Sequence, residues 1–250
     1  MSFILSNDST VYYEEYGTGE PLILLPGLLG TIESHWRRFI PSFAQRFHTV
    51  AVDLRGHGRT NNPSGILSLR ALVEDLHVLL DTLQLPHVRI CGYGIGGYIG
   101  LLYGLQHPGS VQYLVMHATK FYWTPQAVLE ALALLPDQDG NGGLQKDHAP
   151  GNGPDGWKRL LSASQGLIEE MATHGVAEDA LALAGFPVLI TVGELDGLIP
   201  YGEAERLARS LPAGTLTSLQ STQHPIQTLS TSTFMEAVLP FLESSPSANG

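Results

Sequence analysis

The sequence contains a single cysteine and few basic residues. Cys91 alone excludes an internal disulfide and provides no cysteine cluster for a metal ion. Lysine and arginine together number 13 against 24 aspartate and glutamate residues, which gives a formal net charge of -11. So acidic a chain is not expected to bind nucleic acid or an anionic membrane surface.

Long apolar runs are also missing. No stretch approaches the roughly 20 residues that cross a membrane, and the opening MSFILSNDST lacks the basic start and apolar region of a secretory signal. We therefore expect a soluble cytoplasmic protein, whose oligomeric state stays open, a homodimer included. The chain has 250 residues, of which 43% are hydrophobic, enough for one substantial core.

Short apolar runs alternate with helical patterns along the chain. A run such as PLILLP at 21–26 is typical of a strand covered on both faces, whereas leucines along one face of 67–85 predict an amphipathic helix. The alternation predicts one α/β domain over 1–250, with a mostly parallel central sheet flanked by helices. Further strands are predicted at 10–17, 48–54, 87–93, 111–117 and 187–193, and further helices at about 95–106, 202–211 and 232–243.

Residues 119–184 interrupt this alternation. They contain two or three helical patterns and no clear strand, so we predict a helical cap inserted over the ligand-binding edge of the sheet. Within it, residues 136–156 are rich in Gly, Asp, Asn and Pro and are expected to form a mobile loop. Asp137 and Asp139 there fit a calcium loop, but His148 stands where a closing carboxylate is needed, so no metal is predicted.

The stretch CGYGIGGYIG at 91–100 carries the most specific pattern. Gly92, Gly94 and Gly96 follow a predicted strand and open a predicted helix. In such a strand-to-helix turn the central residue is strained, and small residues two positions away let the strand and helix approach each other. The turn places Gly94 above the carboxyl edge of the sheet, beside the free N–H groups of the helix start.

Other loops are expected to reach the same edge of the sheet. Asp196 in VGELDGLIP follows a later strand, and His224 in STQHPIQ precedes the last helix. Nucleophile position, acid and histidine in this order are typical of one fold class. The turn PGLLG after 21–26 can aim the N–H of Leu28 at the same point as the N–H of Ile95, which would make an oxyanion hole.

With the marks PGLLG, DLRGHGRT, GYGIGG, GELDGLIP and TQHP, the chain resembles the α/β-hydrolase superfamily over essentially its whole length. The subgroup it resembles contains small bacterial capped esterases, lactonases and C–C hydrolases. Two positions depart from that pattern, because Pro26 replaces a histidine of many relatives and Gly94 stands in the place of the nucleophile. The resemblance implies Asp196 as the triad acid, His224 as the triad base, Leu28 and Ile95 as the oxyanion-hole donors, and residues 119–184 as the cap.

Glycine at the turn relaxes the backbone but removes the atom that would form an acyl-enzyme. The covalent serine mechanism is therefore impossible with Gly94. Three hypotheses follow: a serine hydrolase whose nucleophile has been replaced, a serine-free enzyme in which His224 is the general base, or a non-catalytic protein that binds a small ligand. The retained Asp196 and His224 favour the first two.

Other groups near the turn have plainer interpretations. Cys91 lies inside a predicted strand and is typical of a packed core thiol. His57 in RGHG is typical of a structural turn residue. His117 and Lys120 follow a predicted strand end, from which they could line a pocket.

The pocket is expected to be mainly apolar and to take a small ester, lactone or ketone. No cofactor is expected for this chemistry. GYGIGG literally matches a dinucleotide fingerprint, but no acidic residue lies about 20 residues further on, which disfavours a nucleotide site. The residues assigned to substrate binding are Leu29, Tyr93, Tyr122 and Trp123.

Overall fold

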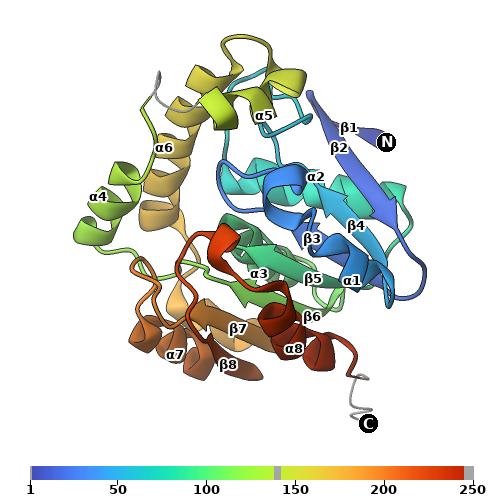
Figure 1. Cartoon of the computed structure of the whole chain (residues 1–250), viewed down its shortest axis with the longest axis vertical. Coiled ribbons are helices and arrows are strands. Elements are labelled where there is room, and N and C mark those ends of the chain that lie inside the picture. The colour runs from blue at the N-terminus through green and yellow to red at the C-terminus, as the bar shows by residue number, and fades with distance from the viewer. Residues whose placement is uncertain (1, 138–141, 245–250) are drawn as a thin grey trace.

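A computed structural model of the chain describes residues 2–137 and 142–244. Its strands are β1 (Ser2–Ser6), β2 (Ser9–Tyr16), β3 (Pro21–Leu25), β4 (His48–Val52), β5 (Val88–Tyr93), β6 (Val111–His117), β7 (Val188–Gly193) and β8 (Gly214–Leu219). They form one sheet in the order β1-β2-β4-β3-β5-β6-β7-β8 (Figure 1). β2 pairs antiparallel with β1 and β4, and the other pairs are parallel, which confirms the predicted α/β class.

Helices cover both faces of the sheet. One face carries α2 (Leu69–Thr82), α3 (Ile95–Gln106) and α7 (Tyr201–Ser210), and the other carries η1 (Ile32–Trp36), α1 (Ile40–Ala44) and α8 (Thr231–Leu242). A short turn of helix, η3 (Ile226–Thr228), precedes α8. None of the described helices combines the length and the apolar character that crossing a bilayer requires.

Side chains of the central strands point alternately into two hydrophobic clusters, one on each face of the sheet. In β3, Ile23 and Leu25 belong to the cluster beneath α2 and α3, whereas Leu22 and Leu24 belong to the cluster beneath α1 and α8. Successive side chains of a strand point to opposite faces, so a run of apolar residues serves two layers at once. The predicted continuous apolar strands were recognisable for this reason.

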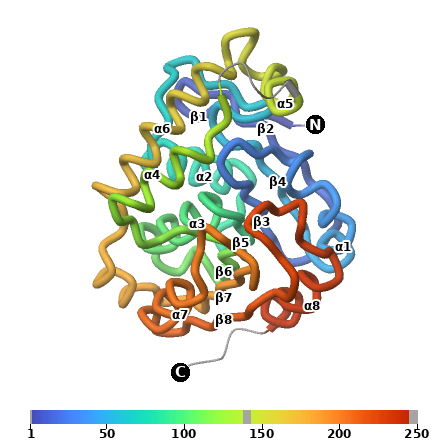
Figure 2. Tube along the Cα trace, turned by 60° about the vertical axis from the view of Figure 1, so that its left-hand side comes forward, coloured from blue at the N-terminus to red at the C-terminus, as the bar shows by residue number. Residues whose placement is uncertain are grey.

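Between β6 and β7 the chain forms α4 (Pro125–Ala133), α5 (Gly142–Asn152), α6 (Gly156–His174) and η2 (Glu178–Leu183). Helices α4 and α6 run side by side, and α5 lies near the end of the sheet formed by β1 and β2 (Figures 1 and 2). We call α4, α5 and α6 the inserted helices.

The expectation of a mobile loop over 136–156 is wrong for most of that range. Residues Gly142–Asn152 form α5 despite their poor helix propensity and the internal Pro150. The reason is tertiary: the Asn152 side chain donates to the carbonyl groups of Gly56 and Thr60, at 3.1 and 3.0 Å. Asp139 of the calcium-like pattern lies outside the described residues.

Candidate active site

The turn between β5 and α3 places Gly94 at its apex. Gly94 has φ 54° and ψ -119°, in the left-handed region that favours glycine. Its N–H donates to the carbonyl of His117 at 2.9 Å, and its own carbonyl accepts the Thr119 hydroxyl at 3.1 Å. The apex is thus fixed to the end of β6 from both sides of its backbone.

The glycines that flank the apex are there for a different reason. A Cβ on Gly92 would lie 2.2 Å from the backbone N of Gly97, and a Cβ on Gly96 would lie 2.3 Å from the carbonyl oxygen of Leu25. A Cβ on Gly94 would meet nothing closer than the Gly27 Cα at 3.7 Å. Close packing therefore requires the flanking glycines, whereas a side chain at position 94 would have open space in front of it.

Asp196 and His224 meet although 28 residues separate them in the chain. Asp196 lies in the loop after β7 and His224 in the loop before η3, and His224 Nδ1 lies 3.0 Å from Asp196 Oδ2. A carboxylate can only accept, so Nδ1 carries the proton and Nε2 is left as an acceptor. The His224 side chain is 26% exposed and the Asp196 side chain is fully buried.

The surroundings of Asp196 keep it ionised. Burial alone would raise the pKa of this carboxyl, but the hydrogen bond and charge of His224 act against it. The N–H groups of Leu198 and Ile199 also donate to Oδ1, each at 2.9 Å. Together these contacts hold the pKa of Asp196 below its ordinary value, so the carboxylate remains an anchor for the imidazole.

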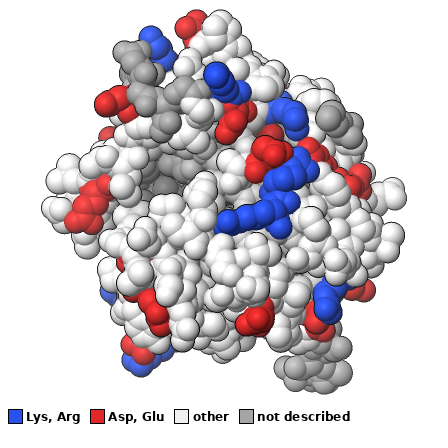
Figure 3. Space-filling view, in the orientation of Figure 1, with Lys and Arg blue, Asp and Glu red and all other residues white. Residues whose placement is uncertain are grey.

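A cavity of about 330 Å³ opens in front of the pair. The surface is hollowed beside the inserted helices, and the rim is mostly uncharged (Figure 3). Gly94 and His224 both line the cavity, together with side chains of the inserted helices such as Ala131 and Ile168. Of the predicted site residues, the cavity is also lined by Leu28, Leu29, Tyr93, Ile95 and Trp123.

The two predicted oxyanion donors have free N–H groups. Within residues 2–137 and 142–244, neither the N–H of Leu28 nor that of Ile95 has a hydrogen-bond acceptor. Ile95 is the first residue of α3, where the backbone N–H points out of the helix without a partner. Both residues line the cavity, so their donors are available to a bound molecule.

Tyr122 does not line this cavity, contrary to the expectation. Its hydroxyl donates to Glu178 at 2.8 Å, and the Arg206 guanidinium lies 4.0 Å from its ring centroid. Trp123, the next residue, faces the cavity instead. Because Tyr122 and Trp123 are adjacent aromatic residues, the sequence alone could not show that only one of them faces the cavity.

Lys120 lines the cavity, as the sequence suggested, and His117 does not. Lys120 Nζ lies 2.5 Å from Glu203 Oε2, and both side chains are nearly buried. Among the described residues, no other Lys, Arg, Asp or Glu lines the cavity. His117 is fully buried, with Nδ1 3.0 Å from the Thr191 hydroxyl. The cavity wall therefore carries one cation whose charge is already compensated.

Cys91 has the structural role that the sequence indicated. Its side chain is completely buried in the cluster beneath α1 and α8. Burial raises the pKa of this thiol far above its ordinary value, so the nucleophilic thiolate is suppressed.

Three histidines surround the loop after β3, and the sequence analysis missed two of them. The sequence indicates no functional role for His35 or His148 and predicts a structural turn residue at His57. All three side chains are nearly or fully buried, and each binds the backbone of Gly27 or Leu29. Isolated histidines at unrelated positions carry no spacing signal, so only the fold reveals that they converge.

The three rings are kept neutral. Burial lowers the pKa of His35 and His57 to about 3, with a further contribution from the charge of a protonated His148. Burial also lowers the pKa of His148 to about 4. Ring nitrogens that would be needed for a metal ion are already hydrogen bonded in His57 and His148.

Known proteins share this architecture. The family model for the alpha/beta hydrolase fold matches residues 20–141. The 3-oxoadipate enol-lactonase 2 of Acinetobacter baylyi is 25% identical over 235 residues, which cover 87% of this chain and 88% of that protein.

Solved structures extend the likeness to nearly the whole chain. An alanine mutant of the meta-cleavage product hydrolase from Pseudomonas fluorescens, complexed with acetates, has a TM-score of 0.83 at 18% identity over 96% of this chain and 97% of that one. The enol-lactonase from Burkholderia xenovorans has a TM-score of 0.75 at 16% identity, over 97% and 100%. At these identities the likeness establishes the fold.

Proposed function

The chain belongs to the α/β-hydrolase superfamily, and from this premise we propose that it hydrolyses a small, uncharged carboxylic ester or lactone through His224 as general base. One observation carries the proposal. His224, which is hydrogen bonded to the buried Asp196, lines the same cavity as Gly94, where no side chain fills the space. Water activated by His224 would take the part that a serine hydroxyl plays elsewhere.

The proposed chemistry needs no covalent intermediate. His224 Nε2 takes a proton from a water molecule while the water oxygen bonds to the carbonyl carbon of the substrate. The carbonyl oxygen becomes an oxyanion, which the N–H groups of Leu28 and Ile95 would stabilise. The imidazolium then gives its proton to the leaving oxygen as the carbon–oxygen bond breaks, and Asp196 stabilises the charged ring throughout.

The cavity supports an uncharged and largely apolar substrate. Its lining is mostly aliphatic and aromatic, and its single cation, Lys120, is paired with Glu203. The lactonases among the similar proteins act, by their names, on enol-lactones. We propose that the inserted helices form a cap over this cavity, because α4 and α6 contribute Ala131, Ile168 and Met171 to its lining.

Replacement of His224 tests the proposal directly. His224→Gln should lower the hydrolysis of p-nitrophenyl butyrate by about 10²-fold, because general-base catalysis contributes about 10²–10⁴-fold. His174→Gln is the matched control, since His174 is an exposed histidine at the end of α6. An unchanged rate in the folded His224→Gln protein would refute the proposed mechanism.

A second candidate is a non-catalytic protein that binds a small apolar ligand. The observation in its favour is the absence of a nucleophilic side chain at Gly94. This candidate predicts no ester turnover by the unmodified chain, together with a rise in the melting temperature when a cavity ligand is added.

A further inference from the structure

Imidazole rings hold both sides of the loop after β3. We define the β3 loop as residues 26–31. The N–H of Gly27 donates to His35 Nδ1 at 3.1 Å, and the N–H of Leu29 donates to His57 Nε2 at 3.0 Å. The carbonyl of Leu29 accepts from His148 Nε2 at 3.2 Å. The two residues that flank Leu28 are therefore fixed by three side chains.

In His57 and His148, the hydrogen bond made by the second ring nitrogen determines which nitrogen carries the proton. His57 Nδ1 lies 2.9 Å from the carbonyl of Arg55, which can only accept, so this nitrogen carries the proton. His148 Nδ1 accepts the N–H of Gly58 at 2.9 Å, so its proton lies on Nε2 and points to Leu29. Both neutral tautomers therefore match their backbone partners.

The β3 loop needs this restraint because its conformation is unfavourable. Leu29 has φ +58°, a region that costs a residue with a Cβ about 1–2 kcal/mol. Both its N–H and its carbonyl are bound by rings. The carbonyl of Gly27 in turn accepts the N–H of Gly30 at 3.0 Å. In a trans peptide the C=O and N–H point in opposite directions, so fixing the Gly27 carbonyl also fixes the direction of the Leu28 N–H.

One of the three rings comes from the inserted helices. His148 lies in α5, 119 residues from Leu29 in the chain. Its ring stacks on Trp157 with 5.7 Å between the centroids and 15° between the planes. The N–H of Gly151 in the same helix donates to the carbonyl of Gly58 at 3.1 Å. Helix α5 is thus docked on the β3 loop and on the loop after β4 at the same time.

From this geometry we propose that His148 is a positioning residue: docking of α5 sets the direction of the Leu28 N–H, and the oxyanion donor is competent only while α5 is docked. The inference rests on the proposed function in one respect, the role of Leu28 as a donor to the substrate oxygen. The inserted helices then do more than enclose the cavity, because one of them completes its polar floor.

Selective labelling makes the Leu28 amide visible. Glycine carrying ¹³C at its carbonyl and leucine carrying ¹⁵N leave signals only for the six Gly–Leu pairs of the sequence in a carbonyl-filtered NMR spectrum. Gly27–Leu28 is one of them, and Gly100–Leu101 in α3 is an internal reference. The full chain is used throughout.

Two variants at position 148 separate hydrogen bonding from packing. His148→Phe keeps a ring beside Trp157 and loses both hydrogen bonds, so the Leu28 signal should shift or broaden while the Leu101 signal stays in place. His148→Gln keeps one donor and one acceptor and should return the Leu28 signal close to its original position. An unmoved Leu28 signal in folded His148→Phe would overturn the proposal.

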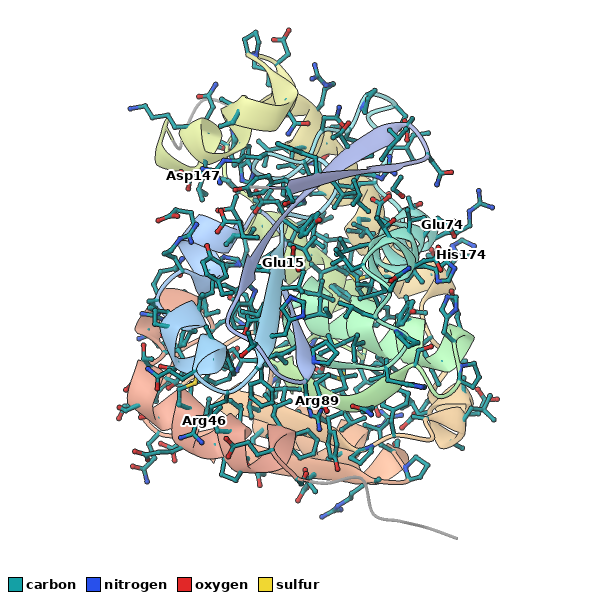
Figure 4. All side chains as sticks on the ribbon, turned by 90° about the vertical axis from the view of Figure 1, so that its right-hand side faces the viewer. Glu15, Arg46, Glu74, Arg89, Asp147 and His174 are labelled. Atoms are coloured by element: carbon teal, nitrogen blue, oxygen red, sulfur yellow. The ribbon has the colours of Figure 1, made fainter. Side chains whose placement is uncertain are left out.

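Two controls exclude unspecific effects. Asp147→Ala changes an exposed neighbour on the same helix, and His174→Phe changes a histidine on the other side of the molecule (Figure 4). Both should leave the Leu28 signal unchanged. A shift of equal size in either control would show that the response does not depend on the hydrogen bonds of His148, and would count against the proposal.

A carboxylate probe distinguishes this inference from the proposed function. Butyrate titrated into the unmodified chain should shift the Leu28 signal, and His148→Phe should weaken its apparent affinity by about tenfold, because losing one oxyanion donor outright costs about 10²–10³-fold. If butyrate leaves Leu28 unmoved in the unmodified chain, the oxyanion role fails, while the response to His148→Phe still decides the coupling.

The unmodified chain offers a test that needs no variant. The ¹⁵N spectrum of the imidazole rings should show the proton of His148 on Nε2 and that of His57 on Nδ1. The opposite tautomer in His148 would remove its hydrogen bond to Leu29 and overturn the proposal even if His148→Phe does not fold.

Discussion

The two sides of the cavity use histidine differently. On the side built by the loops after β7 and β8, His224 is partly exposed and binds the carboxylate of Asp196. On the other side, three histidines are buried and accept hydrogen bonds from backbone N–H groups: His35 in η1, His57 in the loop after β4 and His148 in α5. A carboxylate stabilises a protonated ring, whereas an N–H group pointing at a ring nitrogen excludes a proton from it.

This difference in surroundings suits the histidines on the two sides to different roles. In the proposed mechanism His224 transfers protons, so its ring must be able to change its charge, and the Asp196 carboxylate would stabilise the protonated ring. A ring that only orients a loop performs best when it never changes, and burial lowers the pKa of His57 to about 3. Burial and the type of partner, rather than the residue itself, decide which role a histidine takes.

The largest expected effect comes from placing a nucleophilic hydroxyl at position 94, on the side of the cavity that carries His224. Gly94→Ser should raise the hydrolysis of p-nitrophenyl butyrate by about 10³-fold, because a hydroxyl would then face His224 and the serine and histidine of a triad act as a unit. The space at Gly94 admits a side chain, although its positive φ should cost about 1–3 kcal/mol of stability. Stopped-flow assays should reveal an acyl-enzyme burst.

Gly94→Ala is the matched control for this gain. Alanine carries the same backbone strain and has no hydroxyl, so its rate should stay at the level of the unmodified chain. Equal rates for the serine and alanine variants would show that His224 is not placed to activate a group at position 94, which would contradict the division between the two sides.

An intermediate effect is expected on the β3 side when the pH falls. Burial lowers the pKa of His57 from 6.5 to about 3 in the native state. Between pH 3 and pH 6.5 the ring therefore binds a proton in the unfolded chain but not in the native protein. The free energy of unfolding should therefore fall as the pH falls below about 6.5. At pH 5 the loss attributable to His57 is about 2 kcal/mol, and above pH 7 it vanishes.

Urea unfolding at pH 7 and pH 5 measures this loss. His57→Gln cannot titrate and retains a donor and an acceptor, so it should show about 2 kcal/mol less destabilisation between the two pH values than the unmodified chain. If the free energy of unfolding falls by the same amount in both proteins between pH 7 and pH 5, His57 is not a neutral hydrogen-bond acceptor in the native state. The contrast with His224 would then disappear.

The smallest expected effect concerns the wall of the cavity. Trp123→Ala should raise KM for the ester by about tenfold, because Trp123 lines the cavity and its ring would bury apolar substrate surface. Tyr122→Phe should leave KM within about twofold and cost about 1 kcal/mol of stability, since its hydroxyl binds Glu178. Comparable changes in KM for both variants would place Tyr122 in the binding site after all.

Central strands were predictable because both their faces are buried. The runs at β3, β5 and β7 read as continuous apolar segments, and the structure places all three inside the sheet. The edge strands β1 and β8 were missed. Phe3 and Leu5 in β1 are more than half exposed, so this strand owes its conformation to pairing with β2 rather than to its own pattern.

Some candidate site residues were likewise predictable from the sequence, and others were not. The positions of Asp196 and His224 followed from their order relative to the strands, since parallel strands bring their carboxyl-terminal loops to one edge. The role of α5 could not be predicted, because its glycine, proline and asparagine content favours a loop. His148 and Asn152 make it a helix by binding partners about 90 or more residues away in the chain.

The contact between Leu29 and His148 also bears on the order in which the molecule is made. A loop near the start of the chain depends on a ring that emerges from the ribosome 119 residues later. Closing so long a stretch is entropically costly and slow. We therefore expect β3 and β4 to pair early during synthesis, while the floor of the cavity reaches its final form only after α5 has been translated and has folded back.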